Sequence, residues 1–166
     1  MSKYLPFENI IYKTKFSKEQ AIQKLIDNIE AERTFGFSAP SYTYSKPYIG
    51  QITGNKFKIK RFIKYRNSFL PQIKGEVYSE FDGTKIKVNM SLHKFILVFT
   101  SIWFGIVFLG CSITIYALFT KAFAPFILIP LGLLVFGVAL LFNAFKTESA
   151  KSRKDLMRIF EAEIEK

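Results

Sequence analysis

The sequence predicts an α+β fold: an antiparallel meander of about four strands with one packed helix, followed by a transmembrane helical hairpin and an amphipathic C-terminal helix. Three observations predict it. Residues 17–32 carry an apolar stripe at helical spacing, residues 48–92 alternate apolar and polar residues, and two long uncharged runs follow. The expected domains are a cytoplasmic α+β domain (1–93), the transmembrane hairpin (94–145) and an amphipathic cytoplasmic tail (146–166).

The segment SKEQAIQKLIDNIEAE, residues 17–32, is predicted to form the packed helix. Ser17 can accept a hydrogen bond from the Gln20 amide while the Gln20 side chain reaches back to the Ser17 amide, which is the pattern of a capping box. The apolar stripe consists of Ala21, Ile22, Leu25, Ile26 and Ile29. We expect this stripe to cover the apolar face of the sheet.

Four segments after the helix alternate in the way of half-buried antiparallel strands. They are YIGQIT (48–53), KFKIKRFIKY (56–65), QIKGEVYSEF (72–81) and TKIKVNMSL (84–92). Asp82-Gly83 joins the last two as a two-residue hairpin turn. Before the helix, NIIYKTKF (9–16) fits either a first strand or an extended lead-in. Residues 34–47 have the Gly, Pro and Ser content of a loop or an irregular edge.

The two uncharged runs are predicted to cross a membrane. Spans of about 95–119 and 124–145 are 25 and 22 residues long and contain no Asp, Glu, Lys, Arg or His. At about 1.5 Å per residue, either helix crosses a hydrocarbon core of about 30 Å. The remaining chain is too short and too charged to enclose both helices. Small residues that allow close helix packing define the expected faces between the spans: Ser101, Gly105, Ser112, Gly132 and Ala139.

The distribution of positive charge sets the expected orientation. The net charge is +11, and of the 24 Lys and Arg residues 17 precede Phe95, six follow Phe145 and one, Lys121, lies in the connector. The positive-inside rule therefore places both termini in the cytoplasm, as in a multi-pass protein of a cell inner membrane. Residues 1–30 lack the apolar core of a signal peptide, so the first span is expected to act as its own insertion signal.

The sequence contains few of the residues that are typical of catalytic and metal sites. His93 is the one His and Cys111 the one Cys, whereas a zinc site needs several such ligands. We recognise neither a Ser-His-Asp or Cys-His arrangement nor a glycine-rich phosphate loop. We therefore expect a protein that is not an enzyme and has no cofactor or metal. Cys111 lies inside the first span, so no intrachain disulfide is expected.

Arg61 breaks the alternation of its strand, because it shares the phase of Phe57, Ile59 and Ile63. A buried, unpaired guanidinium is too costly to persist. Three explanations stay open: a bulge at Arg61-Phe62 that swaps the faces, an anionic ligand inside the sheet, or an acidic partner. The candidate partners are Glu8, Asp27 and Glu30.

A candidate binding surface is formed by lysines on the polar face of the strands: Lys56, Lys58, Lys60, Lys85 and Lys87. Such a patch attracts an anionic membrane leaflet, at about 1 kcal/mol for each cation near the surface, or a small anionic ligand. Nucleic acid is not expected as a partner, because aromatic residues do not alternate with these lysines. With one arginine from the same strand and one from the next loop, the candidate residues are Lys58, Lys60, Arg61, Arg66, Lys85 and Lys87.

Large apolar residues in unusual positions are candidates for docking a partner. Phe69 and Leu70 lie in the connection KYRNSFLPQIKG (64–75), where they fold back onto the core, dip into the bilayer interface or dock another protein. Trp103 lies about two turns into the first span, too deep for the usual aromatic belt, and is expected to face a partner helix.

The tail adds a second apolar surface. In the segment 151–166 the residues Leu156, Met157, Phe160 and Ile164 fall on one helical face. This face is expected to lie on the membrane, against the sheet or against a partner helix. The candidate docking residues of the whole chain are thus Phe69, Leu70, Trp103, Leu156 and Phe160.

The pattern FKIKRFIKYRNSFLPQIKGEV…DGTKIKVNMSLHKF, residues 57–95, followed by two spans, resembles uncharacterised small bacterial membrane proteins with an N-terminal α+β domain and a C-terminal two-span hairpin. The resemblance covers about a quarter of the chain. It implies no known activity and no site residues.

Two functions follow as expectations. The first is a non-enzymatic inner-membrane accessory or scaffold protein that binds another membrane protein or complex, or a second copy of itself. The alternative is a sensor or binder of anionic lipid or of a small anionic ligand through the basic sheet face. Membrane lipid is an expected partner in either case.

Overall fold

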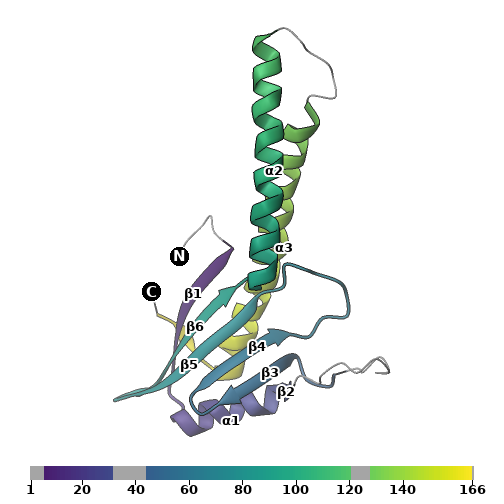
Figure 1. Cartoon of the computed structure of the whole chain (residues 1–166). Helices are drawn as coiled ribbons and strands as arrows, with labels where there is room; N and C mark the ends of the chain where they lie inside the picture. Colours follow the sequence, from purple (N-terminus) through teal and green to yellow (C-terminus); the bar gives the residue numbers. More distant parts are fainter. Residues whose placement is uncertain (1–5, 32–43, 121–127, 166) are drawn as a thin grey trace.

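The computed structural model describes residues 6–31, 44–120 and 128–165. They form a seven-stranded mixed sheet, one short helix, α1 (Lys18–Asn28), and two long apolar helices packed as a pair, α2 (Lys94–Phe119) and α3 (Ile129–Phe160). The pair projects from one end of the sheet (Figure 1). We call the sheet, α1 and the part of α3 after Phe145 the headpiece.

The α+β class is confirmed, but the sheet is larger than the expected meander of about four strands. Its order is β2-β3-β4-β5-β6-β1-β7. The strands are β1 (Phe7–Thr14), β2 (Ile29–Ala31), β3 (Tyr48–Thr53), β4 (Lys56–Arg61), β5 (Gln72–Glu80), β6 (Gly83–Ser91) and β7 (Glu163–Ile164). The expected meander is β3 to β6, although β4 ends at Arg61 and not at residue 65.

Three further strands complete the sheet. The segment 9–16 belongs to a strand and not to a lead-in, since β1 pairs antiparallel with β6 from Phe7 to Thr14. β2 pairs parallel with β3, and β7 pairs antiparallel with β1. Neither β2 nor β7 was expected, because strands of three and two residues are too short to show a period. The segment expected as a loop, 34–47, lies mostly outside the described residues.

The short helix α1 begins as the sequence predicts and ends earlier. Ser17 accepts the Gln20 amide and the Gln20 side chain accepts the Ser17 amide, which confirms the capping box. The helix stops at Asn28, because the backbone of Ile29 is extended and enters β2. Ala21 and Leu25 of the predicted stripe are buried in the core, whereas Ile26 is exposed.

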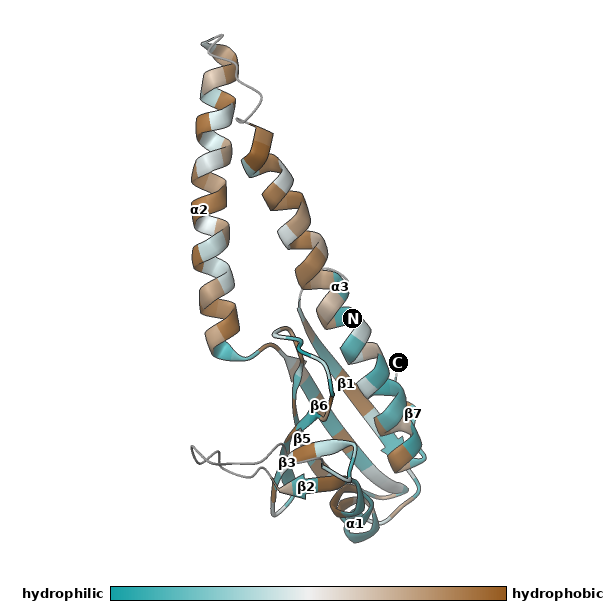
Figure 2. Ribbon diagram, turned by 90° about the vertical axis from the view of Figure 1, so that its right-hand side faces the viewer, coloured by the Kyte–Doolittle hydropathy of each residue, from teal (hydrophilic) through white to brown (hydrophobic). Residues whose placement is uncertain are grey.

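The second long helix does not end where the uncharged run ends. α3 continues without a break from Ile129 to Phe160, so the second span and the separately expected tail helix are one element. Both long helices are long and apolar enough to cross a membrane by length and composition. Figure 2 shows the upper part of the pair coloured as hydrophobic, whereas the lower part of α3 is largely hydrophilic.

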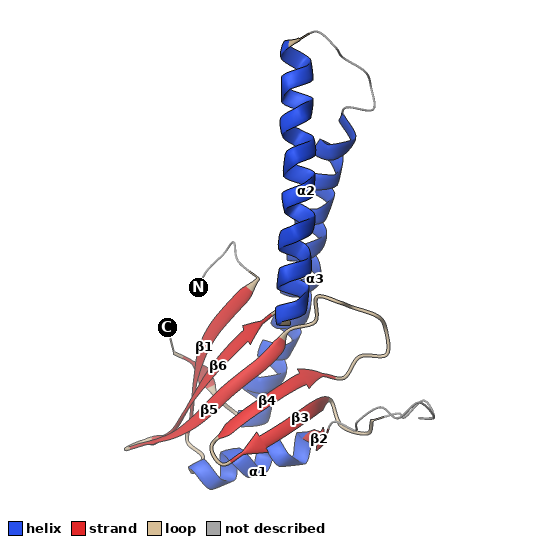
Figure 3. Ribbon diagram, in the orientation of Figure 1, coloured by secondary structure: helices blue, strands red, loops and turns tan. Residues whose placement is uncertain are grey.

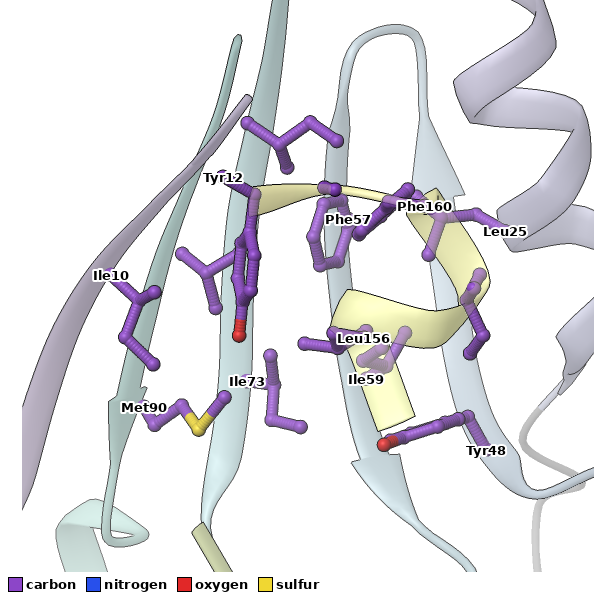
Figure 4. Packing of buried hydrophobic residues seen from close by; sticks show 14 of the residues in the cluster. Ile10, Tyr12, Leu25, Tyr48, Phe57, Ile59, Ile73, Met90, Leu156 and Phe160 are labelled. Atoms are coloured by element: carbon purple, nitrogen blue, oxygen red, sulfur yellow. The ribbon is translucent and has the colours of Figure 1, made fainter. Parts of the chain in front are cut away.

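One face of the sheet is covered and carries the core. In Figure 3, α1 and the lower part of α3 lie behind the strands, on the same side of the sheet. The residues packed there come from β1, β3 to β6 and both helices (Figure 4). They include Ile10, Tyr12, Leu25, Tyr48, Phe57, Ile59, Ile73, Met90, Leu156 and Phe160. The core therefore draws on strands that precede the long helices and on the C-terminal part of α3.

The end of the chain is tied to the first strand. The Thr14 hydroxyl donates to the Phe160 carbonyl at 2.7 Å, and the Glu165 amide donates to the Ile11 carbonyl at 2.9 Å. Between them, Glu161 has a left-handed backbone (φ 46°) that turns the chain from α3 into β7. Ile164 thus lies in a strand, and its expected place on the helical face of the tail is wrong.

The two long helices pack through residues other than the expected small faces. A Cβ at Gly137 would overlap the Trp103 indole, and one at Gly110 would lie 3.1 Å from the Pro130 ring. Trp103 therefore covers a glycine of α3. By contrast, Gly105 and Gly132 face open space, because a Cβ added at either position would have no heavy atom within 4 Å. Bulky side chains thus meet glycines, which lets the backbones approach as small residues on both sides would.

Gly137→Leu is expected to force the helical pair apart and to destabilise it by about 1–3 kcal/mol, because the added side chain overlaps Trp103. Trp103 is the one tryptophan of the chain, so its emission maximum in detergent micelles reports this contact directly. Gly132→Leu is the matched control, since its added side chain enters open space. Equal emission shifts in the two variants would contradict the packing.

Candidate functional site

The second face of the sheet is open and forms the candidate site. Among the described residues no helix covers it, and Figure 1 shows it turned towards the viewer. A groove of about 970 Å³ runs over β3, β4, β5, β6 and β1, with Arg153 of α3, Ile164 of β7 and the following Glu165 in its wall. We call this surface the open face.

One transverse row of side chains crosses the middle of the open face. The strand register places Gln51 opposite Lys58, Lys58 opposite Lys74, Lys74 opposite Asn89, and Asn89 opposite Asn9. All five residues line the groove. The row is thus two cations flanked by amide side chains, with the Asn89 amide donating to the Asn9 side-chain oxygen at 2.6 Å.

Lys58 and Lys74 are a pair of like charges directly opposite each other on neighbouring strands. Such pairs are destabilising, and neither ammonium forms an ion pair with any residue of the described ranges. Neighbouring strands lie about 4.8 Å apart, so one carboxylate above the row can accept hydrogen bonds from both lysines. The arrangement costs stability and suits an anion from outside the chain.

The row next to this pair on the side of the β3–β4 turn contains a carboxylate, Glu76, between Lys56 and Lys87. Lys56 lies 3.9 Å from Glu76, and the Lys87 ammonium lies 4.9 Å from the centre of the Tyr78 ring. Hydrogen bonding from Tyr78 lowers the pKa of Glu76, so this carboxylate is ionised and balances its neighbours.

At the tip of the sheet next to β7, Glu165 accepts hydrogen bonds from Lys13 at 2.8 Å and Lys85 at 2.9 Å. These two contacts lower the pKa of Glu165. Lys85 is therefore engaged within the sheet, in contrast to Lys58 and Lys74, which have no carboxylate partner among the described residues.

Arg61 lies on the opposite, helix-covered face. It is opposite Tyr48 in the regular ladder of β3 and β4, so no bulge swaps its side. Its guanidinium contacts Glu148 at 3.1 Å and Asp155 at 3.5 Å, both from α3. The expectation of an acidic partner is met, but by residues other than Glu8, Asp27 and Glu30.

Glu148 is the centre of a buried polar cluster. Its side chain is only 2% exposed, and it accepts hydrogen bonds from Arg61, from Lys151 at 2.8 Å and from the Tyr65 hydroxyl. Burial raises the pKa of Glu148, but the three hydrogen bonds lower it further than burial raises it, so the net pKa is below the ordinary value. The carboxylate is ionised and joins α3 to the end of β4.

A second buried carboxylate joins α3 to β1. Glu8 accepts hydrogen bonds from Lys146 at 3.1 Å and from the Ser149 hydroxyl at 3.0 Å. From the last residue of the uncharged run onward, the buried stripe of α3 therefore mixes small, acidic and apolar residues: Phe145, Glu148, Ser149, Ser152, Leu156, Ile159 and Phe160. Continuing the helical period of the second span past residue 145 would have revealed this stripe.

The predicted lipid- or ligand-binding residues separate into three places. Lys58, Lys60, Lys85 and Lys87 share the open face, Arg61 is on the covered face, and Arg66 lies in the loop between β4 and β5. Lys56, which belongs to the predicted lysine patch, also lines the groove. Two cations of the groove were not predicted there: Lys74 and Arg153. The strand alternation could have supplied Lys74, whereas Arg153 comes from a different element.

The predicted docking residues are largely engaged within the chain. Leu156 and Phe160 are fully buried in the core, and Trp103 lies against Gly137. Phe69 packs on the edge of the same core, and Leu70 is half-buried. These five side chains therefore contribute to packing within the chain and are not part of the proposed binding site on the open face.

Other groups have structural roles. The His93 ring nitrogen accepts the Phe95 amide at 3.1 Å and so caps α2. Within the described ranges, no three His, Cys, Asp or Glu side chains are grouped as metal ligands.

The fold and the site thus define a class: an α+β headpiece with one open basic face, carried by a pair of long apolar helices. No family model, curated protein or solved structure matches this chain. The functional assignment therefore depends on the geometry alone.

Proposed function

We propose that this protein is a non-enzymatic accessory or scaffold protein of a cell inner membrane, whose open face binds an acidic, extended segment of another membrane protein. In this proposal α2 and α3 cross the bilayer, and both termini and the headpiece lie in the cytoplasm. The observation that carries the proposal is the Lys58–Lys74 pair, which faces outward without an acidic partner among the described residues.

The membrane anchor is supported by what the long helices expose. Only 11% of the most apolar window of each helix is buried within the chain, so most of the apolar surface needs another environment. The side chains that point outward are large and apolar, such as Phe99, Ile106, Phe108, Val135 and Phe136. A contiguous apolar surface of this extent is typical of contact with lipid.

A protein partner is favoured over lipid on the open face because of the direction of that face. In Figure 1 the helical pair extends along the vertical while the open face is turned towards the viewer, so the face runs alongside the axis of the pair and does not cross it. A bilayer crossed by the pair would meet the end of the sheet and not its face. A partner anchored beside this protein in the same membrane can reach the groove.

The partner segment is expected to be acidic and extended. One carboxylate of the partner segment can bridge Lys58 and Lys74. The side-chain amides that flank this pair can form hydrogen bonds with the backbone of the same segment; they belong to Gln51, Asn89 and Asn9. Exposed ion pairs contribute up to about 1 kcal/mol each. Two of them together give roughly a tenfold change in affinity.

The test uses the full chain in nanodiscs and a fluorescein-labelled hexaglutamate peptide, with anisotropy as the readout. Lys58→Gln/Lys74→Gln is expected to weaken binding about tenfold and to reduce its salt dependence. The matched control is Lys15→Gln/Lys154→Gln, which removes the same charge from two exposed lysines outside the groove. Equal losses in both double variants would show that only net charge matters and would overturn the site.

The alternative, a small anionic ligand on the same lysines, has its own outcome in this experiment. If inorganic phosphate displaces the peptide from the unsubstituted protein more strongly than sodium chloride of the same ionic strength does, the groove is a small-anion site. A sodium chloride titration at matched ionic strength separates the two effects.

A further inference from the structure

The loop between β4 and β5, residues 62–71, lies at the end of the sheet from which the long helices project. β5 begins at Gln72, which pairs with Ser91, and His93 caps α2 two residues later. Figure 1 shows the loop beside the base of α2. The loop is thus next to the point where the chain leaves the headpiece.

The depth of this loop follows from one contact with α3. The Tyr65 hydroxyl donates to Glu148, and Glu148 is three residues after Phe145, where the uncharged run ends. At about 1.5 Å per residue, that is roughly 4.5 Å along the helix. The headgroup layer on each side of a bilayer is about 5–8 Å thick. If the uncharged run fills the hydrocarbon core, Tyr65 lies at the depth of the headgroups.

The loop turns its apolar residues inward and its cations outward. Asn67 accepts the Phe69 amide at 2.9 Å, which directs Phe69 onto the core, and Pro71 is buried. Lys64 and Arg66, which flank Tyr65, are exposed and form no ion pair within the described ranges. With the uncharged run across the hydrocarbon core, Lys64 and Arg66 thus lie at headgroup depth on either side of Tyr65.

We propose that this loop is a contact site for anionic phospholipid headgroups, with Lys64 and Arg66 binding phosphodiester oxygens. The inference rests on the proposed membrane anchoring. An arginine guanidinium matches phosphate oxygens with two parallel hydrogen bonds, and a nearby lysine adds a point charge. Because Tyr65 also bonds Glu148 of α3, headgroup contact at the loop fixes the headpiece relative to the span.

The experiment places a fluorophore at the loop tip of the full chain and measures quenching by nitroxide on lipid headgroups. Ser68 is exposed, and Ser68→Cys in a Cys111→Ala background gives one labelling position. In nanodiscs containing phosphatidylglycerol we expect strong quenching, reduced at least twofold in nanodiscs of phosphatidylcholine alone. A label at Phe81→Cys, fully exposed in the β5–β6 hairpin turn, is expected to stay unquenched.

Two double variants test whether Lys64 and Arg66 are the cations that bind the headgroups. Lys64→Gln/Arg66→Gln is expected to reduce quenching in anionic nanodiscs to the phosphatidylcholine level, because the charge that holds the loop at the headgroups is gone. Lys58→Gln/Lys74→Gln, which removes the same charge from the open face, should leave quenching unchanged. All four side chains are exposed, so the substitutions spare the core.

Three results would overturn the inference. Quenching that is the same in both lipids means that the loop is near the bilayer without recognising anionic headgroups. Equal losses in the two double variants mean a net-charge effect. Loss of quenching from anionic nanodiscs on addition of inorganic phosphate, at matched ionic strength, means a free-phosphate site. Failure of the chain to insert into nanodiscs would instead remove the proposed anchoring itself.

Discussion

Replacing Arg61 with methionine is expected to lower the free energy of unfolding by about 3 kcal/mol, because it leaves the Glu148 carboxylate buried without its guanidinium. For a chain of this length the loss corresponds to a decrease in melting temperature of about 6–12 °C. Thermal unfolding in mild detergent, followed by circular dichroism, measures it. Lys58→Met on the open face is the control and should change stability by less than about 0.5 kcal/mol.

The double variant Arg61→Met/Glu148→Met is expected to regain most of this loss. Removing both charges together leaves no buried carboxylate without its guanidinium, and replacement of a buried ion pair by apolar residues is often nearly neutral. Each of the two remaining ions loses one contact, but Asp155 keeps Arg158 at 3.5 Å and Lys151 is exposed to solvent. A double variant as unstable as the sum of the two single variants would show that Arg61 and Glu148 are not energetically coupled.

Acidification tests the same ion pair without removing the arginine. The pKa of Glu148 is lowered in the folded protein, so its contribution to stability is complete above the unfolded value of about 4.3 and is lost as the pH falls through the folded pKa. The stability difference between the unsubstituted protein and Glu148→Gln should therefore shrink below about pH 4. A difference that is independent of pH in this range would mean that Glu148 does not act through its charge.

The elements that the sequence predicts well are those whose signal is local. The capping box of Ser17 and Gln20 and the alternation of β4 to β6 each depend on neighbouring residues and are present in the structure. The expected hairpin is also present, but its turn lies one position earlier than Asp82-Gly83: Glu80 pairs with Gly83, so the turn residues are Phe81 and Asp82. The position of Lys58 on the open face follows from the same alternation.

The elements that the sequence does not predict depend on distant residues. β7 is two residues long and exists because β1 offers an edge to it. The partners of Arg61 are 87 and 94 positions further along the chain, beyond both long helices, so no local pattern could connect them. Gly137 and Trp103 are likewise paired only by the antiparallel packing of the two helices.

This topology places the two long helices inside the sequence of the headpiece. β1 to β6 precede α2, whereas Leu156 and Phe160 of the same core follow the uncharged part of α3. The covered face of the sheet cannot close until the chain has passed through both long helices and returned. The C-terminal part of α3 is thus an internal component of the headpiece, in contrast to the expected tail that could also lie on the membrane.

Phe160→Ala is accordingly expected to destabilise the headpiece by about 3–5 kcal/mol. The ring is fully buried, packs 6.3 Å from the Tyr12 ring and leaves a cavity between α3 and the sheet when it is removed. Phe81→Ala deletes the same ring from a fully exposed turn and should be nearly neutral. Limited proteolysis in detergent distinguishes headpiece opening from loss of the long helices, since cleavage should begin within the sheet. If the end of α3 lay on the membrane, Phe160→Ala would weaken membrane contact and leave headpiece proteolysis equal to that of Phe81→Ala.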